Sequence, residues 1–381
     1  KALEILKTVY GFNDFRPFQW EIINSLLQKK DVLTLMPTGG GKSLCFQIPA
    51  LLNDGVTIVV SPLIALMKDQ VEGLVGNGIS ANYINSSQNS SEQEAVIQGL
   101  RDKKIKLLYV SPEKLISDHF LSFVATLNVS LVAIDEAHCI SAWGHDFRPE
   151  YAQLGLLRNR FEGVPFIALT ATADKLTRKD IISQLALNKP EIFISSFDRP
   201  NLSLSVLPGK KRFELIIDFL IKRENEAGII YCLSRKSTEN LAAKLRAHGF
   251  SAIYYHAGMN SDDRQKAQED FINDDVNIVC ATVAFGMGID KSNVRFVIHY
   301  NLPKNIEGYY QEIGRAGRDG IDSDTLLFYS YADVVQLNQF IEKSGQKEFQ
   351  AAHLAHLRDL KNNQREYGKN DLDSGKFLCD H

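Results

Sequence analysis

A glycine-rich turn near the amino terminus carries residues that could bind phosphate. The stretch Pro37-Thr38-Gly39-Gly40-Gly41-Lys42-Ser43 follows an apolar run and precedes a helical pattern. Glycines let backbone N–H groups surround phosphate oxygens, and a helix start adds positive dipole character. We expect Lys42 to reach the β- and γ-phosphates of ATP and Ser43 to coordinate Mg²⁺. The match is partial because Met36 stands where the strict pattern has Gly, so a glycine-rich turn beside a chance lysine is the alternative.

Two adjacent carboxylates follow another apolar run. Leu131 to Ile134 leads into Asp135-Glu136-Ala137-His138, which places both acids at the carboxyl end of a predicted strand. Open parallel sheets bind ligands at this end. Asp135 suits Mg²⁺, through water, and Glu136 suits the polarisation of an attacking water molecule. Together with the phosphate loop, the pair predicts nucleotide hydrolysis; an ordinary exposed strand end is the alternative.

The composition limits the class of protein that could carry these residues. The 381 residues are 44% hydrophobic and 23% charged, which is typical of two to three globular domains. No signal segment or run of about 20 apolar residues is present. The net charge of −3 argues against a uniformly basic surface but allows a local basic groove. The five cysteines form no Cys-x-x-Cys pair, so we expect reduced, buried thiols and an intracellular protein.

Strand-like runs alternate with helical patterns in two successive sets, which predicts an α/β fold of two domains. The runs are continuous, so each sheet should be mostly parallel and covered by helices on both faces. The first set lies at 32–35, 57–60, 107–110, 131–134 and 166–169, and the second at 228–232, 252–255, 277–280, 296–298 and 325–328. We expect domains at 1–205 and 206–340, followed by a helical and irregular tail at 341–381. A helix should open with a capping box of Ser91 and Glu94, and another should run from Thr238 to His248, closed by Gly249.

Several motifs occur in the order of superfamily 2 helicases. They are Asp135-Glu136-Ala137-His138, Ser61-Pro62-Leu63, the stretch Leu169 to Ala173, and the stretch Gln311 to Arg318. The stretches Phe15 to Gln19, Cys139 to Tyr151 and Phe285 to Lys291 resemble the RecQ family of DNA helicases. The resemblance covers about residues 1 to 340. It implies two tandem RecA-like domains and an ATP-dependent DNA helicase that moves 3′ to 5′ on single-stranded DNA, acting on forked DNA in recombination and repair.

The resemblance also assigns nucleotide-binding residues. Gln19 would read the adenine edge with help from Arg16 and from an aromatic side chain near Phe15, and Gln311 would also contact the nucleotide. Arg315 and Arg318 would come from the second domain, with Arg318 as an arginine finger, so that domain closure completes the ATP site. Core packing is the alternative for Phe15 and Phe18, and a structural ion pair is the alternative for Arg315.

Other residues are expected to contact DNA or couple it to hydrolysis. The aromatic-rich loop with Trp143, His145, Phe147 and Arg148 could stack bases. By the resemblance, this loop couples single-stranded DNA to ATP hydrolysis. The hydroxyls of Ser61, Thr170, Thr172 and Thr282 could contact phosphates or link the two sites. Lys236 and Lys291 could hold phosphates. Solvated or capping side chains are the alternative for these hydroxyls and lysines.

Relatives usually continue into a four-cysteine zinc module and a winged helix, and neither is evident here. Because the sequence starts at Lys1 without Met, we interpret it as a piece of a longer protein that stops before or within any zinc region. His353 and His356 share a helical face, but zinc is not supported. We expect a monomer, located in the cytoplasm or nucleoid if the protein is bacterial and in the nucleus if it is eukaryotic. Two rival functions remain: an RNA helicase or translocase of the same superfamily, and an ATP-gated clamp without turnover.

Overall fold

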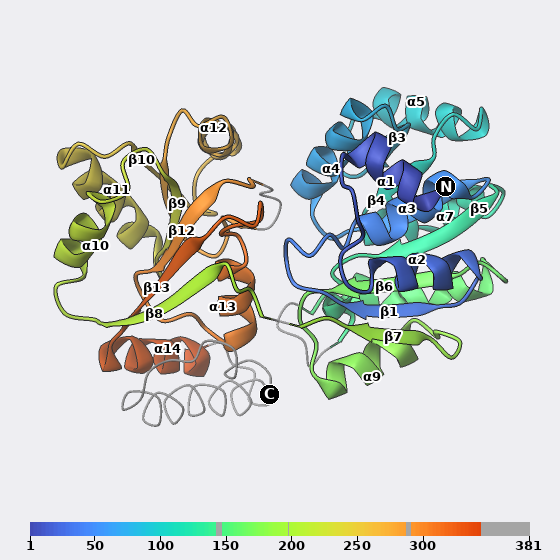
Figure 1. Cartoon of the computed structure of the whole chain (residues 1–381). Helices are drawn as coiled ribbons and strands as arrows, with labels where there is room; N and C mark the ends of the chain where they lie inside the picture. The colour runs from blue at the N-terminus through green and yellow to red at the C-terminus, as the bar shows by residue number, and fades with distance from the viewer. Residues whose placement is uncertain (142–146, 197, 287–290, 344–381) are drawn as a thin grey trace. The chain divides into compact units, whose positions relative to one another are not determined.

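The computed structural model describes residues 1–141, 147–196, 198–286 and 291–343. The chain divides between Phe197 and Asp198 into two compact units, which are described separately (Figure 1). The division comes earlier than the expected boundary after residue 205. The reason is that β8 (Leu202–Pro208) pairs with β13 (Ser323–Tyr329) over its whole length and so belongs to the second sheet.

Unit 1 is built on a seven-stranded parallel sheet with the order β3-β4-β2-β5-β6-β1-β7. Its strands are β1 (Val32–Leu35), β2 (Val56–Val60), β3 (Ala81–Ile84), β4 (Leu107–Val110), β5 (Val129–Ile134), β6 (Phe166–Thr170) and β7 (Glu191–Ile194). The expected parallel sheet and its five continuous runs are confirmed. The runs did not include β3 and β7, which are edge strands with partly exposed side chains and therefore lack a continuous apolar pattern.

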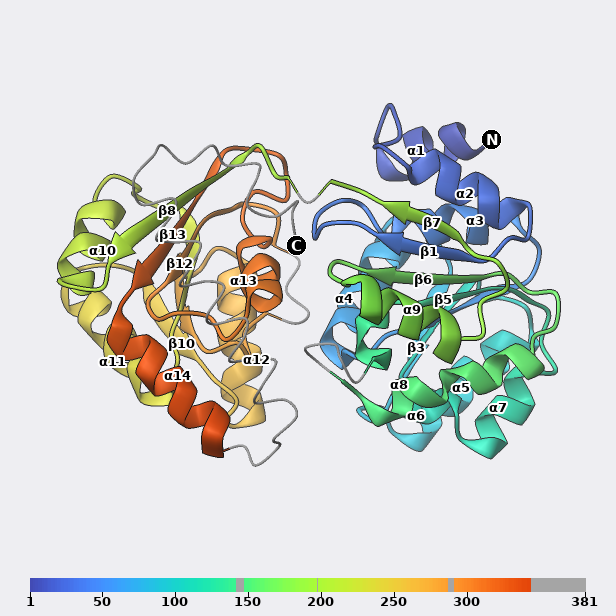
Figure 2. The ribbon, with the colours of Figure 1, turned by 90° about the horizontal axis from the view of Figure 1, so that it is seen from below.

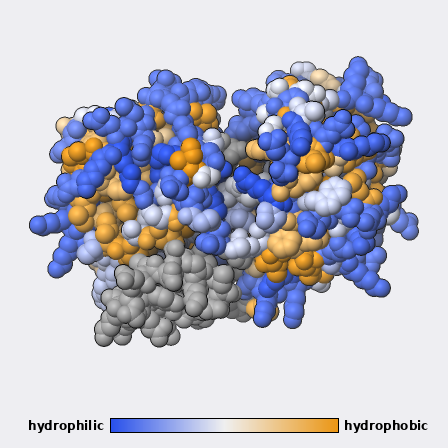
Figure 3. Space-filling view, viewed as in Figure 1, coloured by the Kyte–Doolittle hydropathy of each residue, from blue (hydrophilic) through white to orange (hydrophobic). Residues whose placement is uncertain are grey.

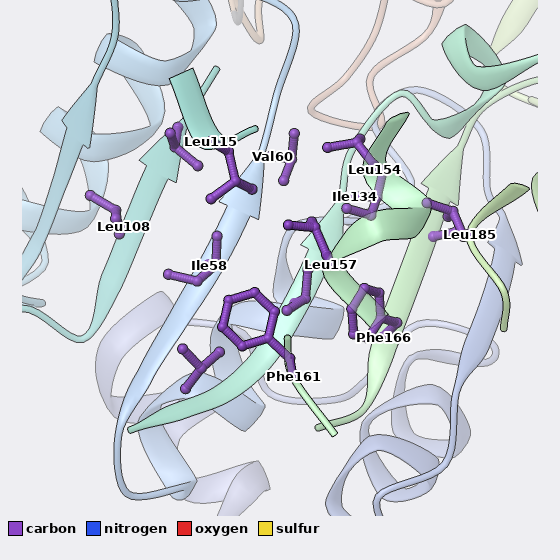
Figure 4. Close-up of a cluster of buried hydrophobic side chains, with 14 of the residues drawn as sticks. Ile58, Val60, Leu108, Leu115, Ile134, Leu154, Leu157, Phe161, Phe166 and Leu185 are labelled. Atoms are coloured by element: carbon purple, nitrogen blue, oxygen red, sulfur yellow. The ribbon is translucent and has the colours of Figure 1, made fainter. Parts of the chain in front are cut away.

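Helices cover both faces of this sheet, which explains why its central strands are mostly apolar on both faces. Leu33, Ile58 and Val60 face one cluster, whereas Val32 and Val59 face the other. The first cluster, drawn in Figure 4, packs the strands against the segments that carry Leu115, Leu154, Leu157 and Leu185. Figure 2 shows α5 to α8 on one side of the strands and α1 to α3 on the other.

The helical elements of unit 1 differ in one capping detail from expectation. They are α1 (Ala2–Tyr10), α2 (Gln19–Leu27), α3 (Leu44–Leu52), α4 (Ile64–Gly76), α5 (Ser90–Arg101), α6 (Pro112–Leu115), α7 (Asp118–Val124), α8 (Pro149–Ala152), α9 (Lys175–Gln184), and the 3₁₀ helices η1 (Ala137–Ile140) and η2 (Gln153–Asn159). The prediction of a capping box from Ser91 and Glu94 is wrong. Asn89 caps α5, and its reciprocal partner is Glu92. Asparagine accepts the orphan N–H as well as serine does.

Unit 2 has a six-stranded parallel sheet with the order β10-β11-β9-β12-β13-β8. Its other strands are β9 (Ala227–Tyr231), β10 (Ala252–Tyr255), β11 (Ile278–Ala281) and β12 (Val294–His299). Its helices are α10 (Arg212–Leu220), α11 (Arg235–Ala247), α12 (Ser261–Ile272), α13 (Ile306–Ile313) and α14 (Tyr331–Lys343). The helix expected from Thr238 begins earlier, at Arg235, and Gly249 follows it in the left-handed conformation.

The edge strand β7 leaves apolar side chains at the surface of unit 1. Ile192 and Ile194 are exposed, whereas Phe193 between them packs against Phe18. Figure 3 shows hydrophobic surface over this strand. In the part of the chain that the structure describes, no helix is long and apolar enough to cross a membrane.

Candidate functional site

The expected catalytic residues of unit 1 meet at one edge of its sheet. Strands β2, β5, β6 and β1 are consecutive neighbours. Ser61 follows β2, Asp135 follows β5, Thr170 ends β6 and the phosphate loop follows β1. All are carboxyl ends of parallel strands, where such sheets bind ligands. The fold therefore brings together motifs that lie far apart in the sequence.

The phosphate loop turns sharply between β1 and α3. Gly39 and Gly41 have positive φ angles of 76° and 79°. A Cβ on Gly40 would lie 2.9 Å from the carbonyl oxygen of Pro37, so this position also requires glycine. The Nζ atom of Lys42 donates to the carbonyls of Met36 at 3.0 Å and Pro37 at 3.3 Å. Lys42 thus contacts the backbone of the same loop in which it is expected to bind phosphate.

The two residues expected at the adenine hold the backbone of this loop. Gln19 is buried, and its Nε2 donates to the carbonyl of Gly41 at 3.1 Å. Its Oε1 accepts from the backbone N–H of Arg16 at 2.9 Å, and the Arg16 guanidinium donates to the carbonyl of Gly39. The amide group that would read adenine is therefore already bound to the loop that would hold the phosphates.

The two acids after β5 have an unusual electrostatic environment. Burial, and next the neighbouring Glu136, raise the pKa of Asp135 to about 7, while Lys42 opposes this shift. The Asp135 Oδ1 accepts from the backbone N–H of Glu136 at 3.0 Å, and Tyr151 donates to the Asp135 carbonyl at 3.1 Å. Glu136 adopts a left-handed backbone with φ of 48°. Two half-buried acids side by side repel each other when both are ionised, which favours a cation between or beside them.

His138 lies between Glu136 and the end of β6. The Nδ1 atom of His138 lies 3.3 Å from the Glu136 carboxylate and 2.9 Å from the Thr170 hydroxyl. Thr170 donates onward to the carbonyl of Thr172 at 2.9 Å, so its oxygen accepts from a protonated Nδ1. All of Thr170 is buried, which favours the linking role over direct phosphate contact. The Glu136 carboxylate thus lies beside a histidine that is bonded to the end of the neighbouring strand.

Three buried hydroxyls at this edge have no hydrogen-bond partner among the described residues. They belong to Ser61 after β2, Ser111 after β4 and Thr172 after β6. Buried hydroxyls are normally paired, so this edge offers donors to a ligand. Ser111 was not among the sequence candidates. Its position directly after a buried strand, like that of Ser61, was the signal that could have identified it.

The aromatic-rich loop is described only in part. Phe147 is exposed, and the Arg148 guanidinium donates to the carbonyl of Pro62 at 3.1 Å. The backbone N–H of Arg148 also donates to the carbonyl of Cys139 at 2.9 Å. Arg148 therefore joins the segment after the acids to the segment after β2. Trp143 and His145 lie outside the described residues.

In unit 2 the expected nucleotide residues lie on α13 and the loop after it. Asn305 caps the start of α13, and Gln311 lies on its last turn. The Arg315 guanidinium donates to the carbonyl of Gly286, which replaces the ion pair considered for it. Arg315 and Arg318 are both half-buried. Thr282 follows β11 at the carboxyl edge of this sheet and is half-buried.

A buried pair that the sequence did not suggest fastens α13 to the sheet. The Nε2 atom of His299, on β12, lies 2.6 Å from the Glu312 carboxylate. The imidazole is stacked on Tyr231 and meets Tyr309 edge-on. His299 ends an apolar strand, and only the fold shows that Glu312 faces it.

Lys291 is engaged inside unit 2. Its Nζ pairs with Asp274 at 2.8 Å and donates to the carbonyl of Ile272 at 3.0 Å, and the side chain is buried. The phosphate-binding interpretation of Lys291 is therefore wrong; it is a structural ion pair. Lys236 is exposed on α11, and this exposure agrees both with phosphate binding and with a solvated side chain.

A hollow of 920 Å³ lies at the opposite, amino-terminal edge of the unit 1 sheet. It is lined by residues that precede β1, β6 and β7, among them Lys29, Lys30, Asp31 and Lys189. Asp31 pairs with Arg158 at 2.6 Å, and Lys30 pairs with Glu191. None of the expected catalytic residues lies there, so the hollow is not the candidate site.

Known proteins match the chain over nearly its whole length. The DEAD/DEAH box helicase profile matches residues 16–181, and the helicase conserved C-terminal domain profile matches residues 211–320. The chain is 50% identical over 356 residues to ATP-dependent DNA helicase RecQ of Pasteurella multocida (strain Pm70), across 93% of this chain and 56% of that protein. It is 51% identical over 340 residues to ATP-dependent DNA helicase RecQ of Haemophilus influenzae, across 89% of this chain and 55% of that protein.

The chain thus spans about half the length of the curated relatives it matches. A solved structure of Mss116p bound to ssRNA and AMP-PNP aligns with a TM-score of 0.70 at 19% identity, over 89% of this chain and 75% of that chain. This likeness shows the fold, two RecA-like units. The two helicase profiles match one after the other along the chain, and half of the aligned residues are identical to those of RecQ proteins. The chain therefore belongs to the RecQ family of superfamily 2 helicases, of which it carries the helicase core.

Proposed function

We propose that this chain is the motor of an ATP-dependent DNA helicase that moves 3′ to 5′ along single-stranded DNA in recombination and repair. One observation carries the proposal. A phosphate loop, a pair of adjacent acids and buried hydroxyls without a described partner share one sheet edge. Arg148, and the contacts of His138 with Glu136 and Thr170, join these segments. Family membership favours DNA as the polymer.

Each residue at the edge has a distinct role in the proposed hydrolysis. Lys42 binds the β- and γ-phosphates in place of the carbonyls it now contacts. Glu136 accepts a proton from water as the water oxygen bonds to the γ-phosphorus and the bond to the β-phosphate oxygen breaks. Arg315 and Arg318 of unit 2 stabilise the charge on the transferring phosphoryl group. Gln19, Arg16 and Gln311 hold the nucleotide.

The residues present fit a divalent cation. Asp135 is half-buried beside Glu136 with a raised pKa, and the Ser43 hydroxyl lies at the start of α3. A hard cation with oxygen ligands would stabilise the ionised form of Asp135. When bound with ATP, Mg²⁺ neutralises phosphate charge. Ser43 and Asp135 are the residues that would hold it.

The proposed DNA track follows the same edge. The hydroxyls of Ser61, Thr172 and Ser111 are buried like that of Thr170, so they suit a role that links the DNA strand to the ATP site rather than direct contact with its phosphates. The loop with Trp143, Phe147 and Arg148 would stack bases. Through Arg148 and Pro62 this loop is joined to the Ser61 segment, and through Cys139 to the acid pair. Strand binding could thereby alter the position of Glu136.

The deciding experiment combines unwinding and ATP turnover. We expect the protein to separate 3′-tailed duplexes with ATP, and 5′-tailed duplexes much less. Lys42→Ala and Glu136→Gln should each lower turnover about 100-fold or more, since each removes a group acting in the transition state. Glu72→Gln, an exposed residue of α4, is the matched control.

The polymer is tested in the same assay. Single-stranded DNA should stimulate turnover more than RNA of the same sequence. Stronger stimulation by RNA would favour an RNA helicase, and polymer binding with no ATP turnover would favour a clamp. Turnover that survives both substitutions at this edge would overturn the catalytic assignments.

A further inference from the structure

The first residues of unit 2 lie against the loop that carries the two arginines of the proposed site. The Arg199 guanidinium donates to the carbonyls of Ala316 at 3.0 Å and Gly317 at 2.8 Å. The Asn201 amide donates to the carbonyls of Gly317 and Ile321, both at 3.0 Å. No sequence motif pointed to these contacts, because the two segments are more than a hundred positions apart.

The two side chains also fix each other. The Arg199 Nε donates to the Asn201 Oδ1 at 3.3 Å, so the amide oxygen is used within the pair and the amide nitrogen points to the loop. Asn201 is further held by its own backbone, whose carbonyl accepts from the N–H of Ser323 at 2.8 Å. A donor pair that is itself oriented loses little entropy when it binds the loop.

The loop fits this pair closely. Gly317 has a φ of 57°, and a Cβ there would lie 2.4 Å from the Asn201 amide nitrogen and 2.7 Å from the carbonyl oxygen of Ile321. Its N–H donates to the carbonyl of Val294 at 2.9 Å. The peptide groups between Arg315 and Arg318 are therefore held on both the donor and the acceptor side.

Sheet formation does not need these side chains. β8 and β13 pair through their backbones from Leu202 and Ser323 onward. Arg199 and Asn201 lie before that ladder, and their side chains contact the carbonyls of the loop. Their contacts define the backbone on both sides of Ala316 and Gly317, and hence the direction in which the flanking arginines leave the chain.

We propose that Arg199 and Asn201 are positioning residues for Arg315 and Arg318. The proposal rests on the proposed function, in which these arginines stabilise the transferring phosphoryl group. A cation displaced by about 1 Å from such a group can cost on the order of 100-fold in rate. The segment that begins unit 2 thus sets the geometry of the catalytic arginines without touching ATP.

The test measures kcat and KM for ATP with saturating single-stranded DNA, together with the melting temperature. Asn201→Ala and Arg199→Ala should lower kcat about 10-fold, with KM changed less than twofold and the melting temperature changed by only a few degrees. Arg199→Lys keeps a charge but only one compact donor group, so it should restore part of kcat. Arg223→Ala, which removes an ion pair with Asp324 on the same sheet, should leave kcat unchanged.

A double substitution separates this proposal from the proposed function. In an Arg318→Ala background, adding Asn201→Ala should lower kcat by a smaller factor than it does in the wild type, because only Arg315 is left to be positioned. An equal further loss in that background, or unchanged kcat in Asn201→Ala alone, would overturn the positioning role. If Arg318→Ala alone retains wild-type turnover, the catalytic assignment of Arg318 fails instead.

Discussion

The phosphate loop of unit 1 and the arginine loop 314–318 of unit 2 both carry cationic side chains, yet different contacts hold their backbones. In the phosphate loop, Lys42, Arg16 and Gln19 bind loop carbonyls with the same groups that are proposed to bind ATP. In the arginine loop, Arg199 and Asn201 hold the carbonyls, and neither has a proposed contact with ATP.

The difference separates two ways of preparing a site. Contacts made by ligand-binding groups must be exchanged when the nucleotide arrives, so the phosphate loop is expected to rearrange. Contacts made by other residues persist, so the arginine loop keeps its geometry. Substitutions of Arg16 and Gln19, the first-loop contacts outside the transition state, should therefore act mainly on KM, and substitutions around the second loop mainly on kcat.

Among the substitutions that test this comparison, the largest fall in kcat is expected for Gly317→Ala. Gly317→Ala introduces a Cβ against the backbone of Ile321, which cannot move as a flexible side chain can. The loop must shift, and kcat should fall about 10- to 100-fold. Gly249→Ala is the control, because its φ is also positive but nothing lies within 4 Å of the added carbon. Steady-state turnover of both variants measures the difference; similar kcat values would break the comparison.

A smaller effect is expected at Gln19. Gln19→Ala removes the amide that contacts Gly41 and Arg16 and that is proposed to read adenine. We expect KM for ATP to rise about 5- to 10-fold, because the variant loses one to two hydrogen bonds to the nucleotide. The kcat value should stay nearly unchanged. Gln98→Ala, on the surface of α5, should leave both constants as they are. A fall in kcat with constant KM would contradict the idea of an exchangeable loop.

Arg148 tests the connection between the edge and the polymer. Arg148→Ala breaks the contact with Pro62, and Trp143→Ala removes an aromatic group of the same loop. In both variants, ATP turnover without DNA should remain largely intact. Stimulation of turnover by single-stranded DNA should fall about 5-fold or more, which is the size of effect that typical coupling between two sites produces. Arg178→Ala on α9 is the control. Full stimulation in both loop variants would exclude them from coupling.

The smallest effect concerns stability and pH. The pKa of Asp135 is raised to about 7, so the folded state binds a proton more tightly than the unfolded state does. Stability from this group is present at low pH and is lost as pH rises from about 4 to about 7. Asp135→Asn should therefore melt a few degrees higher than wild type at pH 8, with the gain shrinking toward pH 4. A gain independent of pH would refute this electrostatic cause.

Much of the fold could be predicted from the sequence, because buried parallel strands have a simple signature. Val32 to Leu35 and Leu131 to Ile134 are apolar on both faces and are covered on both faces. The edge strands β7 and β8 could not be found in this way. Their side chains alternate between burial and exposure, and each has only one neighbouring strand.

The same distinction applies to the candidate site: some of its residues have a local signature in the sequence, and others do not. Residues next to strand ends, such as Ser61 and Asp135, could be placed from the sequence because strand order brings those ends together. Contacts between distant segments could not. The pairing of His299 with Glu312, and the buried ion pair of Lys291 with Asp274, depend on which side chains the packing turns toward each other. No local pattern records that choice.

During synthesis, β1, which precedes the phosphate loop, is made long before β6 and β7, the strands with which it pairs. β1 ends at Leu35, but its neighbours β6 and β7 begin at Phe166 and Glu191. In unit 2, β8 likewise pairs only with β13, the last strand of that sheet. Such long-range pairings form slowly and leave apolar surface exposed in the meantime. A nascent chain therefore cannot assemble a nucleotide-binding loop until nearly all of unit 1 has been made, which makes ATP binding a late checkpoint of its folding.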